Sequence, residues 1–435
     1  MSQLIIKGPK TLKGEFTING FKNAATPIIA AALLIEEECI LDNVPRVGDV
    51  EKMVALMKSL GCAIEWTGFH ELTINAKDAT PKTLDETLIK TMRSSVLFIG
   101  PLLARFKKIT IPEPGGCFLG NRPLTTHFSI LEQFGAKIDE RRDKQGKCEF
   151  TITIKELKGA DVTLPEFSVT ATENAILLGA LASGRTTIRL AAQEPHVADL
   201  IKFLDAAGAR IREKSGNRIV IDGVGRLRGI AHAIIPDMLE TGTLAVASAL
   251  LGRGVILYGV DQEHLSIALL KLKEIGVKYE TGRDRHKGAY LKILPSKDFT
   301  AFKIQTLPYP GFPTDLQEPF SLLATQSRGA SIIHDPLFED RMKHIPELVK
   351  MGARAIVCDP HRSIIIGPTP LHSYELKSLN IRAGGMFVIA GLLAEGETVI
   401  HNVEDTIDRG YERLDERLNA LGAAIKRVDP ENFRG

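Results

Sequence analysis

Residues 203–213 read FLDAAGARIRE, a helix-like run, then a glycine, then a strand-like run. Gly208 falls where the helix would end, and glycine most readily adopts the left-handed conformation found at helix C-termini. The same arrangement recurs as LMKSLGCAIEW (56–66), ILEQFGAKIDE (130–140), KLKEIGVKYE (271–280), LVKMGARAIV (348–357) and LNALGAAIKRV (418–428). The turn glycines, Gly61, Gly135, Gly208, Gly276, Gly352 and Gly422, recur at intervals of roughly 70 residues, so six copies of one unit tile the chain.

A second pattern belongs to the same unit: an apolar helix ends in a short turn and leads into a β-branched strand. Examples are LASGRTTIRL (181–190), LLGRGVILYG (250–259), TQSRGASIIHD (325–335) and LLAEGETVIHN (392–402). Each unit therefore reads helix, turn, strand, loop, helix, glycine turn, strand. Six such βαβ-type units exceed one core, and pairing three with three predicts two similar α/β domains.

The composition of the 435-residue chain is that of an ordinary water-soluble protein, with 44% apolar and 25% charged residues and a net charge of +2. Basic and acidic residues are interspersed, so neither nucleic acid nor a membrane is an expected partner. The basic runs at 140–144 and 282–287 are predicted to be solvated hairpin tips. The apolar stretch at 26–35 is too short to cross a bilayer, and the N-terminus lacks the pattern of a signal peptide.

The five cysteines are odd in number and never in CxxC spacing, which predicts a reducing compartment, the cytoplasm, and no disulfide framework. The eleven histidines show no metal-binding spacing, and the GxGxxG and GxxxxGK[ST] motifs are absent. We therefore expect no metal and no cofactor.

One cysteine has an unusual setting, in PEPGGCFLGNRP (112–123). Glycines and prolines shape the loop around Cys117, and Arg122 is close enough in sequence to supply the positive charge that activates a thiol. From these residues alone, a reactive thiol and a structural cysteine in a glycine-rich turn are equally good interpretations.

A third pattern marks the predicted start of the first helix of each unit. These starts are FKNAATP (21–27), KTMRSS (90–95), SVTATEN (168–174), PDMLETGT (236–243), FPTDLQ (312–317) and IRAGG (381–385). Helix N-termini carry partial positive charge, so several that converge would make an anion site. Candidate functional residues at these starts are Lys22, Arg93, Asp315 and Arg382, and those predicted in connecting loops are Cys117, Arg122, Glu194, Arg341 and Arg409.

Together with FEDRMKHIPEL (338–348) and IDRGYERL (407–414), these segments resemble the UDP-N-acetylglucosamine enolpyruvyl transferases nearly end to end. The resemblance implies two inside-out α/β domains, each of three repeats with approximate threefold symmetry, and an active site between them. One domain would comprise residues 1–21 and 236–435 and the other residues 22–235. The chain crossings would fall near Gly20 to Lys22 and near Ile235 to Asp237.

The resemblance also implies a reaction, the first committed step of peptidoglycan synthesis. The enolpyruvyl group of phosphoenolpyruvate would move to the 3-hydroxyl of the N-acetylglucosamine part of UDP-N-acetylglucosamine, through a tetrahedral ketal, with release of phosphate. The expected partners are these two small molecules, and the expected state is a monomer. Cys117 would be the acid that protonates the methylene carbon and the residue that an anionic epoxide such as fosfomycin alkylates.

Other residues take their roles from the same resemblance. Asp315 would be the base for the sugar hydroxyl, although Thr-Asp before an apolar run by itself favours a helix cap. Lys22, Arg122 and Arg409 would hold the phosphate and carboxylate of the donor, with Arg93, Arg341 and Arg382 nearby, since guanidinium groups suit such anions. The remaining residues of the implied binding site are Asn23, Pro123, Leu124, His127, Ser168, Val169, Thr170, Glu194, Asp237 and Phe338. Helix starts in solvent would explain Glu194 and Asp237 without any function.

The chain departs from the family at four positions. Asn380 and Thr125 stand where the family has, usually or often, aspartate; Met238 stands where it often has arginine; and Glu166 stands where many members have lysine. An amide at 380 cannot take up a proton or balance the charge of Arg382. Two alternatives therefore stay open: a related transferase with a different acceptor, such as a free nucleotide, and a catalytically silent binding protein with the same fold.

Overall fold

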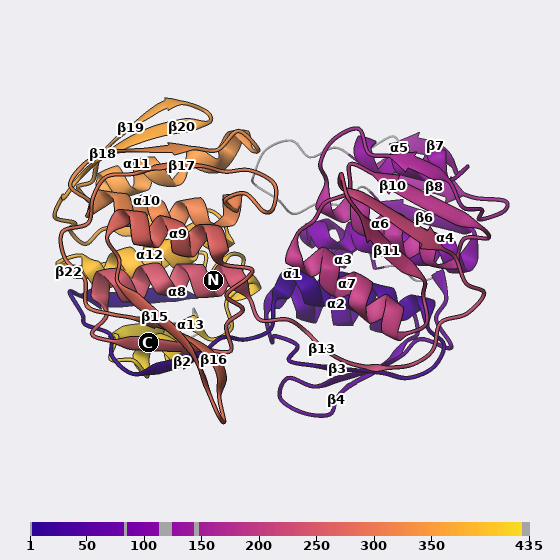
Figure 1. Cartoon of the computed structure of the whole chain (residues 1–435), viewed down its shortest axis with the longest axis horizontal. Helices are drawn as coiled ribbons and strands as arrows, with labels where there is room; N and C mark the ends of the chain where they lie inside the picture. Colours follow the sequence, from indigo (N-terminus) through magenta and orange to yellow (C-terminus); the bar gives the residue numbers. More distant parts are fainter. Residues whose placement is uncertain (1, 82–84, 113–123, 143–147, 429–435) are drawn as a thin grey trace, which may run out of the picture. The chain divides into compact units, whose positions relative to one another are not determined.

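The computed structural model describes residues 2–81, 85–112, 124–142 and 148–428, and the predicted site residues Cys117, Arg122 and Pro123 lie outside these ranges. The chain divides by its contacts into two compact units (Figure 1). The terminal unit runs through Asn19 and resumes at Pro236, and the central unit lies between Gly20 and Ile235. The sequence-based division places the first crossing two residues later, between Phe21 and Lys22.

Sheets form the outer layer of each unit. In the described part of the central unit the strand orders are β13(Ala231–Ala233)-β3(Cys39–Asp42)-β5(Leu72–Asn75)-β4(Ala63–Trp66), β6(Lys108–Pro112)-β8(Cys148–Thr153)-β7(Lys137–Arg142) and β11(Ile211–Lys214)-β12(Arg218–Asp222)-β10(Arg185–Arg189)-β9(Asp161–Thr163). In the terminal unit they are β21(Glu375–Lys377)-β22(Gly396–His401)-β1(Gln3–Gly8)-β23(Ile425–Val428), β15(Tyr279–Asp284)-β16(Gly288–Ile293)-β14(Val255–Tyr258)-β2(Glu15–Thr17) and β17(Lys303–Gln305)-β18(Gly329–His334)-β20(Arg362–Gly367)-β19(Arg354–Asp359).

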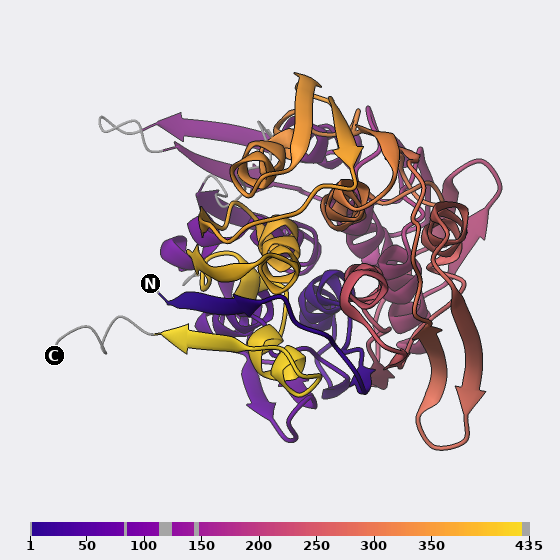
Figure 2. The ribbon, with the colours of Figure 1, turned by 90° about the vertical axis from the view of Figure 1, so that its left-hand side faces the viewer.

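The start of the chain completes two sheets that the second half of the chain forms. Strand β1 pairs antiparallel with both β22 and β23, with Leu4 opposite Ile400 and Arg427. Figure 2 shows this indigo strand beside the yellow C-terminal strand. Strand β2 adds a parallel edge to β14. The terminal unit is therefore closed by segments from both ends of the chain.

Apolar helices fill the middle of each unit. They are α1(Lys22–Ala31), η3(Arg93–Phe98) with α4(Ile99–Phe106) and α6(Val169–Leu181) in the central unit, and α8(Met238–Leu251), α10(Gln317–Thr325) and α12(Ile381–Leu393) in the terminal unit. In the terminal unit all three pack against one another, and in the central unit η3 contacts both α1 and α6. A helix that is apolar on every side belongs in a core. This is the inside-out α/β fold that the sequence predicts.

A second helix in each repeat ends at a turn glycine. These helices are α2(Gly48–Ser59), α5(Thr125–Gln133), α7(Pro195–Ala206), α9(Ser266–Ile275), α11(His344–Lys350) and α13(Leu414–Asn419). The six predicted glycines that follow them have φ between 86° and 103°, a conformation that other residues adopt only with strain. The helix, glycine, strand reading of the repeat is therefore confirmed.

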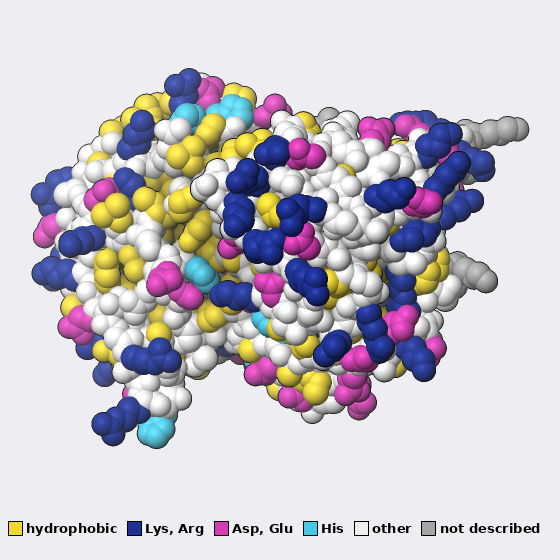
Figure 3. Space-filling model, turned by 45° about the vertical axis from the view of Figure 1, so that its right-hand side comes forward, with side chains coloured by type: hydrophobic (Ala, Val, Ile, Leu, Met, Phe, Trp, Pro, Cys, Tyr) yellow, Lys and Arg dark blue, Asp and Glu magenta, His cyan; other side chains and the backbone are white. Residues whose placement is uncertain are grey.

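The two basic runs that the sequence predicts at hairpin tips are described only in part. The basic run at 282–287 covers the end of β15 and the turn into β16, and Figure 3 shows basic side chains and a histidine at the tip of this projecting hairpin. The run at 140–144 ends β7, and its last two residues lie outside the described part of the chain.

The cysteines within the described ranges, Cys39, Cys62, Cys148 and Cys358, are all free. Across those same ranges, every helix is too short or too polar to cross a bilayer.

Candidate functional site

Asp315 lies at the centre of a charged cluster at the helix starts of the terminal unit. It belongs to η4(Thr314–Leu316), the single turn that leads into α10. Arg341 donates from Nη2 to Oδ1 of Asp315, and Arg382 donates from Nε to Oδ2 at 3.2 Å. The Asp315 side chain is 26% exposed, whereas each arginine side chain is 3% exposed. We call Asp315, Glu318, Arg341 and Arg382 the Asp315 cluster.

The helix-cap interpretation of Asp315 is wrong, because its oxygens accept from guanidinium groups and η4 begins without a side-chain cap. Burial acts to raise the pKa of Asp315, but the charges and hydrogen bonds of Arg341 and Arg382 outweigh it and hold that pKa well below its usual range. Asp315 is therefore an ionised carboxylate with one partly exposed side.

Arg341 is held from several directions. It lies in the short helix η5(Glu339–Met342), not in the loop that the sequence predicts. Its Nη1 donates to Oε1 of Glu318 at 2.8 Å, and its guanidinium lies 5.5 Å from the ring centre of Phe338. Its carbonyl oxygen accepts from Nε2 of Gln317 at 3.0 Å and from Nδ1 of His344 at 2.9 Å. The backbone of Arg341 is thus held by Gln317 and His344, and its guanidinium by Glu318, so that its charge is presented to Asp315 in one geometry.

Arg382 reaches the cluster from the start of α12. The side chain of Asn380 caps this helix by accepting from the backbone N–H groups of Arg382 and Ala383, both at 2.9 Å. The departure from aspartate at 380 thus keeps the capping oxygen. The guanidinium of Arg382 lies 5.2 Å from the ring centre of Tyr411, which is 1% exposed.

Asp237 is a buried carboxylate of the same unit. It caps α8 by accepting from the N–H groups of Leu239 (2.8 Å) and Glu240 (3.0 Å). Burial raises the pKa of Asp237 to about 6, against the lowering effect of the charge of Arg382. The interpretation of Asp237 as a solvated helix start is wrong, since the residue is 3% exposed. Met238, the next departure, is the buried first residue of α8.

Lys22 forms a separate charged pair in the central unit. It is the first residue of α1, and its Nζ lies 3.0 Å from Oδ2 of Asp49, in the first turn of α2. The two side chains are 12% and 3% exposed. Asn23 follows in the same helix turn and is half-buried. The pair orients the ammonium group while leaving part of it accessible.

His127 joins two helix starts of the central unit. Asn174 donates from Nδ2 to Nδ1 of His127 (3.3 Å), so the Nε2–H of the neutral ring donates to the Thr170 hydroxyl (3.1 Å). Burial, and then the charge of Arg93, lowers the pKa of His127 to about 3. Ser168 caps α6, accepting from the backbone N–H of Ala171 at 3.4 Å. His127 is thus a neutral hydrogen-bonding group next to that cap.

The other predicted residues of the central unit lie at neighbouring helix starts. Leu124 is buried just ahead of α5, Val169 is the first residue of α6, and Glu194 is the half-buried residue before α7. Glu166 is exposed and accepts at 2.5 Å from the hydroxyl of Thr126, and Thr125 is exposed. The carboxylate of Glu166, where many family members have lysine, is therefore hydrogen bonded to the hydroxyl of Thr126.

The structure brings together Asp237, Asp315, Arg341 and Arg382 in one unit and His127, Ser168 and Thr170 in the other. Arg409 is half-buried at the end of η6(Ile407–Arg409), not in a loop as predicted. Sequence reasoning missed Asp49, Glu318 and Tyr411. Two of them had a visible signal: Tyr411 lies within the quoted segment IDRGYERL (407–414), and Glu318, three positions after Asp315, falls on the same side of a helix turn.

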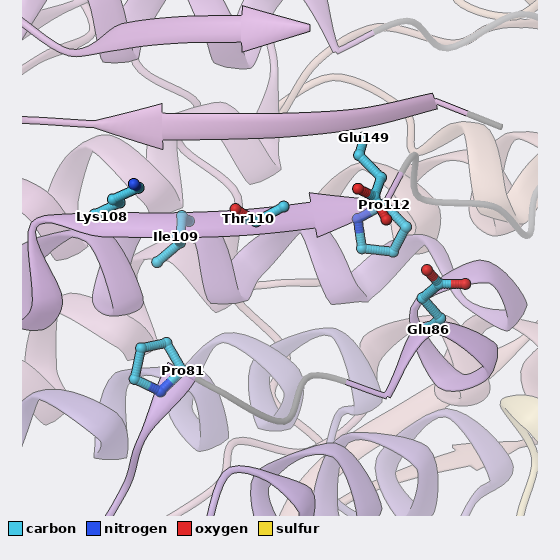
Figure 4. A pocket seen from close by; sticks show the side chains of 7 residues that line it. All are labelled: Pro81, Glu86, Lys108, Ile109, Thr110, Pro112 and Glu149. Carbon is cyan, nitrogen blue, oxygen red and sulfur yellow. The ribbon is translucent and has the colours of Figure 1, made fainter. Parts of the chain in front are cut away.

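Metal-binding groups and cavities were further candidates for a functional site. Within 2–81, 85–112, 124–142 and 148–428, no group of three or more histidine, cysteine, aspartate and glutamate side chains could hold a metal ion. A cavity of about 370 Å³ lies beside β6, and Pro81, Glu86 and Glu149 are among the residues that line it. Figure 4 shows these side chains. None of the predicted site residues that the structure describes lines it.

Solved structures define the class of fold. The enolpyruvyl transferase NikO from Streptomyces tendae superposes with a TM-score of 0.87 at 24% identity, covering 98% of this chain and 99% of that one. EPSP synthase from Acinetobacter baumannii superposes with a TM-score of 0.75 at 21% identity, covering 99% and 100%. The chain has the fold of the enolpyruvyl transferases.

Sequence relatives define the family. The model of EPSP synthase (3-phosphoshikimate 1-carboxyvinyltransferase) matches residues 6–418. UDP-N-acetylglucosamine 1-carboxyvinyltransferase 1 of Carboxydothermus hydrogenoformans is 41% identical over 99% of both chains. UDP-N-acetylglucosamine 1-carboxyvinyltransferase of Bradyrhizobium diazoefficiens is 42% identical over 98% of both. The chain belongs to the enolpyruvyl transferase family, as the sequence motifs predict.

Proposed function

We propose that this chain is a UDP-N-acetylglucosamine 1-carboxyvinyltransferase. It transfers the enolpyruvyl group of phosphoenolpyruvate to the 3-hydroxyl of the sugar of UDP-N-acetylglucosamine and releases phosphate, in the first step of peptidoglycan synthesis. Identity of about 40% over nearly the whole length to relatives of that name supports this acceptor. The structural observation that carries the proposal is the ionised Asp315 carboxylate, held by two buried arginines and exposed on one side.

The reaction consists of an addition and an elimination. In the addition, the hydroxyl oxygen of the acceptor bonds to C2 of phosphoenolpyruvate, its proton passes to Asp315, and Cys117 protonates the methylene carbon. In the elimination, the thiolate left on Cys117 takes a proton back from that same carbon, and the electrons of the broken C–H bond form the new double bond. The bond between C2 and the phosphate oxygen breaks, and phosphate departs with the electron pair of that bond. Proton transfer by positioned groups of this kind contributes about 10²–10⁴-fold each.

The donor carries a phosphate and a carboxylate, and the site must supply cations for both. We assign this role to Lys22, Arg93, Arg122, Arg382 and Arg409. Arg382 has two tasks, since it also holds Asp315. An anion bound beside Arg382 would offset the charge that lowers the pKa of Asp315. Donor binding would thus make Asp315 a stronger base at the moment when the acceptor hydroxyl needs one.

The central unit supplies polar groups suited to the nucleotide part of the acceptor. The start of α6 offers free backbone N–H groups, which favour phosphate. The neutral His127, hydrogen bonded to Thr170, adds no charge at that helix start. We propose that Leu124, His127, Ser168, Val169 and Thr170 bind the uridine and diphosphate, and that Asn23 binds the sugar.

The test is release of phosphate from phosphoenolpyruvate. The wild-type protein is mixed with the donor and UDP-N-acetylglucosamine, and phosphate and the mass of the enolpyruvyl product are measured. Asp315→Asn is expected to reduce turnover by about 10²–10⁴-fold, because the amide cannot take the hydroxyl proton. Asp298→Asn, at an exposed carboxylate paired with Arg328, is the control and keeps wild-type turnover.

Other acceptors separate the alternatives. Phosphate release with 3-phosphoshikimate or a free nucleotide, but not with UDP-N-acetylglucosamine, would show that the acceptor is misassigned. Tight binding of both proposed substrates without phosphate release would instead indicate a catalytically silent protein. Full turnover by Asp315→Asn would refute the role of Asp315 as the base but would leave the proposed function intact.

A further inference from the structure

We propose that Glu318 is a positioning residue for the transfer: it holds Arg341 and supplies the negative charge that lets Asp315 accept a proton without leaving Arg341 unbalanced. This inference rests on the proposed role of Asp315 as the base. Glu318 is the second residue of α10, three positions after Asp315, and Arg341 donates to both carboxylates.

The burial of this pair is the main observation. The Glu318 side chain is 0% exposed and that of Arg341 is 3% exposed, so water screens neither charge effectively. Oε1 of Glu318 accepts from Arg341 at 2.8 Å, while Oε2 finds no hydrogen-bond partner in the described part of the chain. A fully buried carboxylate with an unsatisfied oxygen is costly to maintain. Its position against Arg341 therefore needs a reason beyond packing.

Charge balance supplies that reason. While Asp315 is ionised, Arg341 is shared between two carboxylates, and Arg382 also pairs with Asp315. When Asp315 takes the hydroxyl proton, it becomes neutral, and Glu318 is then the one ion-pair partner that Arg341 keeps among the described residues, with the charge of Asp335 farther off. Without Glu318, the same proton transfer would leave a buried guanidinium unpaired, which opposes protonation of Asp315. Glu318 thus makes Asp315 a better base than the two arginines alone would allow.

Helix α10, which carries Glu318, packs against α8, α11, α12, η4, β18 and β20. Besides Asp315 and Arg341, the buried titratable groups on or next to these elements are Asp237, Glu240, Asp335, His344 and Arg382. Burial raises the pKa of Glu318, and with the charge of Asp315 it outweighs the lowering effect of Arg341, so that the pKa lies above its usual value. Asp315 and Glu318 are therefore expected to titrate as a coupled pair.

The experiment uses the full-length chain and Glu318→Gln, which keeps the shape and one acceptor for Arg341 but removes the charge. With phosphoenolpyruvate and UDP-N-acetylglucosamine, kcat is expected to fall about tenfold while KM for both substrates changes less than about twofold. The acid limb of the pH profile of kcat moves to lower pH, because the base becomes weaker. Glu318→Asp, which keeps the charge, recovers part of the activity. Glu347→Gln, at a carboxylate of α11 that pairs with Lys350, is the matched control.

A purely structural role predicts something different. If Glu318→Gln raises KM for phosphoenolpyruvate but leaves kcat and its pH profile unchanged, Glu318 only holds Arg341 and the proposal is overturned. Absence of phosphate release by the wild type would refute the proposed function instead.

Urea unfolding tests the shared charge of Arg341 without any need for activity. The free energy of unfolding is measured for the wild type, Asp315→Asn, Glu318→Gln and the double variant. If the double variant loses more free energy of unfolding than the two single variants together, the proposal is supported. If the losses simply add, it is overturned.

Discussion

Single residues in this protein act through shared partners. Arg341 joins Asp315 to Glu318, Arg382 joins Asp315 to Tyr411, and each arginine side chain is almost wholly buried. An arginine met only in the sequence would ordinarily be an exposed ion pair of small effect. Burial changes this, because a buried charge that loses its partner is strongly destabilising. Substitutions in the Asp315 cluster are therefore expected to affect both stability and turnover.

Two buried histidines predict how stability depends on pH. Burial, with the charge of Arg93, lowers the pKa of His127 to about 3, and burial is also the main cause that lowers the pKa of His344 to about 3. Above pH 6.5 neither the folded nor the unfolded state binds the proton, so nothing is lost. Between pH 6.5 and about 3 only the unfolded state binds it. Each histidine then lowers the free energy of unfolding by about 1.4 kcal/mol per pH unit.

Urea unfolding between about pH 7 and about pH 5 checks this. His127→Gln is expected to lose less stability over that range than the wild type, because glutamine does not titrate. His286→Gln, in the exposed turn between β15 and β16, serves as the control and follows the wild type. If the free energy of unfolding of the wild type and of His127→Gln depended on pH in the same way, His127 would not be held neutral in the folded state.

At the scale of elements, the site depends on how helices begin and how the paired helices end. Ser168, Asp237 and Asn380 cap α6, α8 and α12 with side-chain oxygens, and candidate site residues lie at these caps or directly after them. The glycine turns end the second helices and send the chain into the outer sheets. The backbone N–H of Ala209 donates to the carbonyl of Leu204 at 2.9 Å across one such turn. The repeat thus determines at which helix end each candidate site residue lies.

Substitution of one turn glycine measures this contribution. Gly208 has φ 103° with nothing within 4 Å of an added Cβ, so Gly208→Ala introduces backbone strain and no clash. We expect a loss of about 1–2 kcal/mol in the free energy of unfolding. Gly225 has equally open surroundings without a positive φ, so Gly225→Ala is the matched control and stays near neutral. Equal effects of the two substitutions in urea unfolding would show that the turn conformation is not the cause.

At the scale of the whole molecule, each unit has a core of its own. Phe203 in the central unit and Phe387 in the terminal unit are both 0% exposed, and each lies within a separate set of helices. We propose that the two units unfold as separate cooperative transitions, because each buries its own apolar helices.

Scanning calorimetry of two matched variants checks this proposal. Phe203→Ala is expected to lower the free energy of unfolding of the central unit, and Phe387→Ala that of the terminal unit. Each loss is about 3–5 kcal/mol, because contacts are lost and a cavity is left, and the corresponding transition moves to lower temperature. Substrates are omitted, so that ligand binding does not couple the transitions. A single transition that both variants lower equally would mean that the chain unfolds as one body.

The sequence by itself determined the sixfold repeat, the turn glycines, the helix starts and the family. These depend on local periodicity, on the conformational freedom of glycine and on motifs that are read in order along the chain. It also placed Lys22, Asp315 and Arg382 at helix starts. Only the tertiary structure decided their partners: Asp315 pairs with residues 26 and 67 positions away, and Lys22 with one 27 positions away. Such pairs, and the burial of Glu318, depend on which helix ends the fold brings together, and no local pattern encodes that.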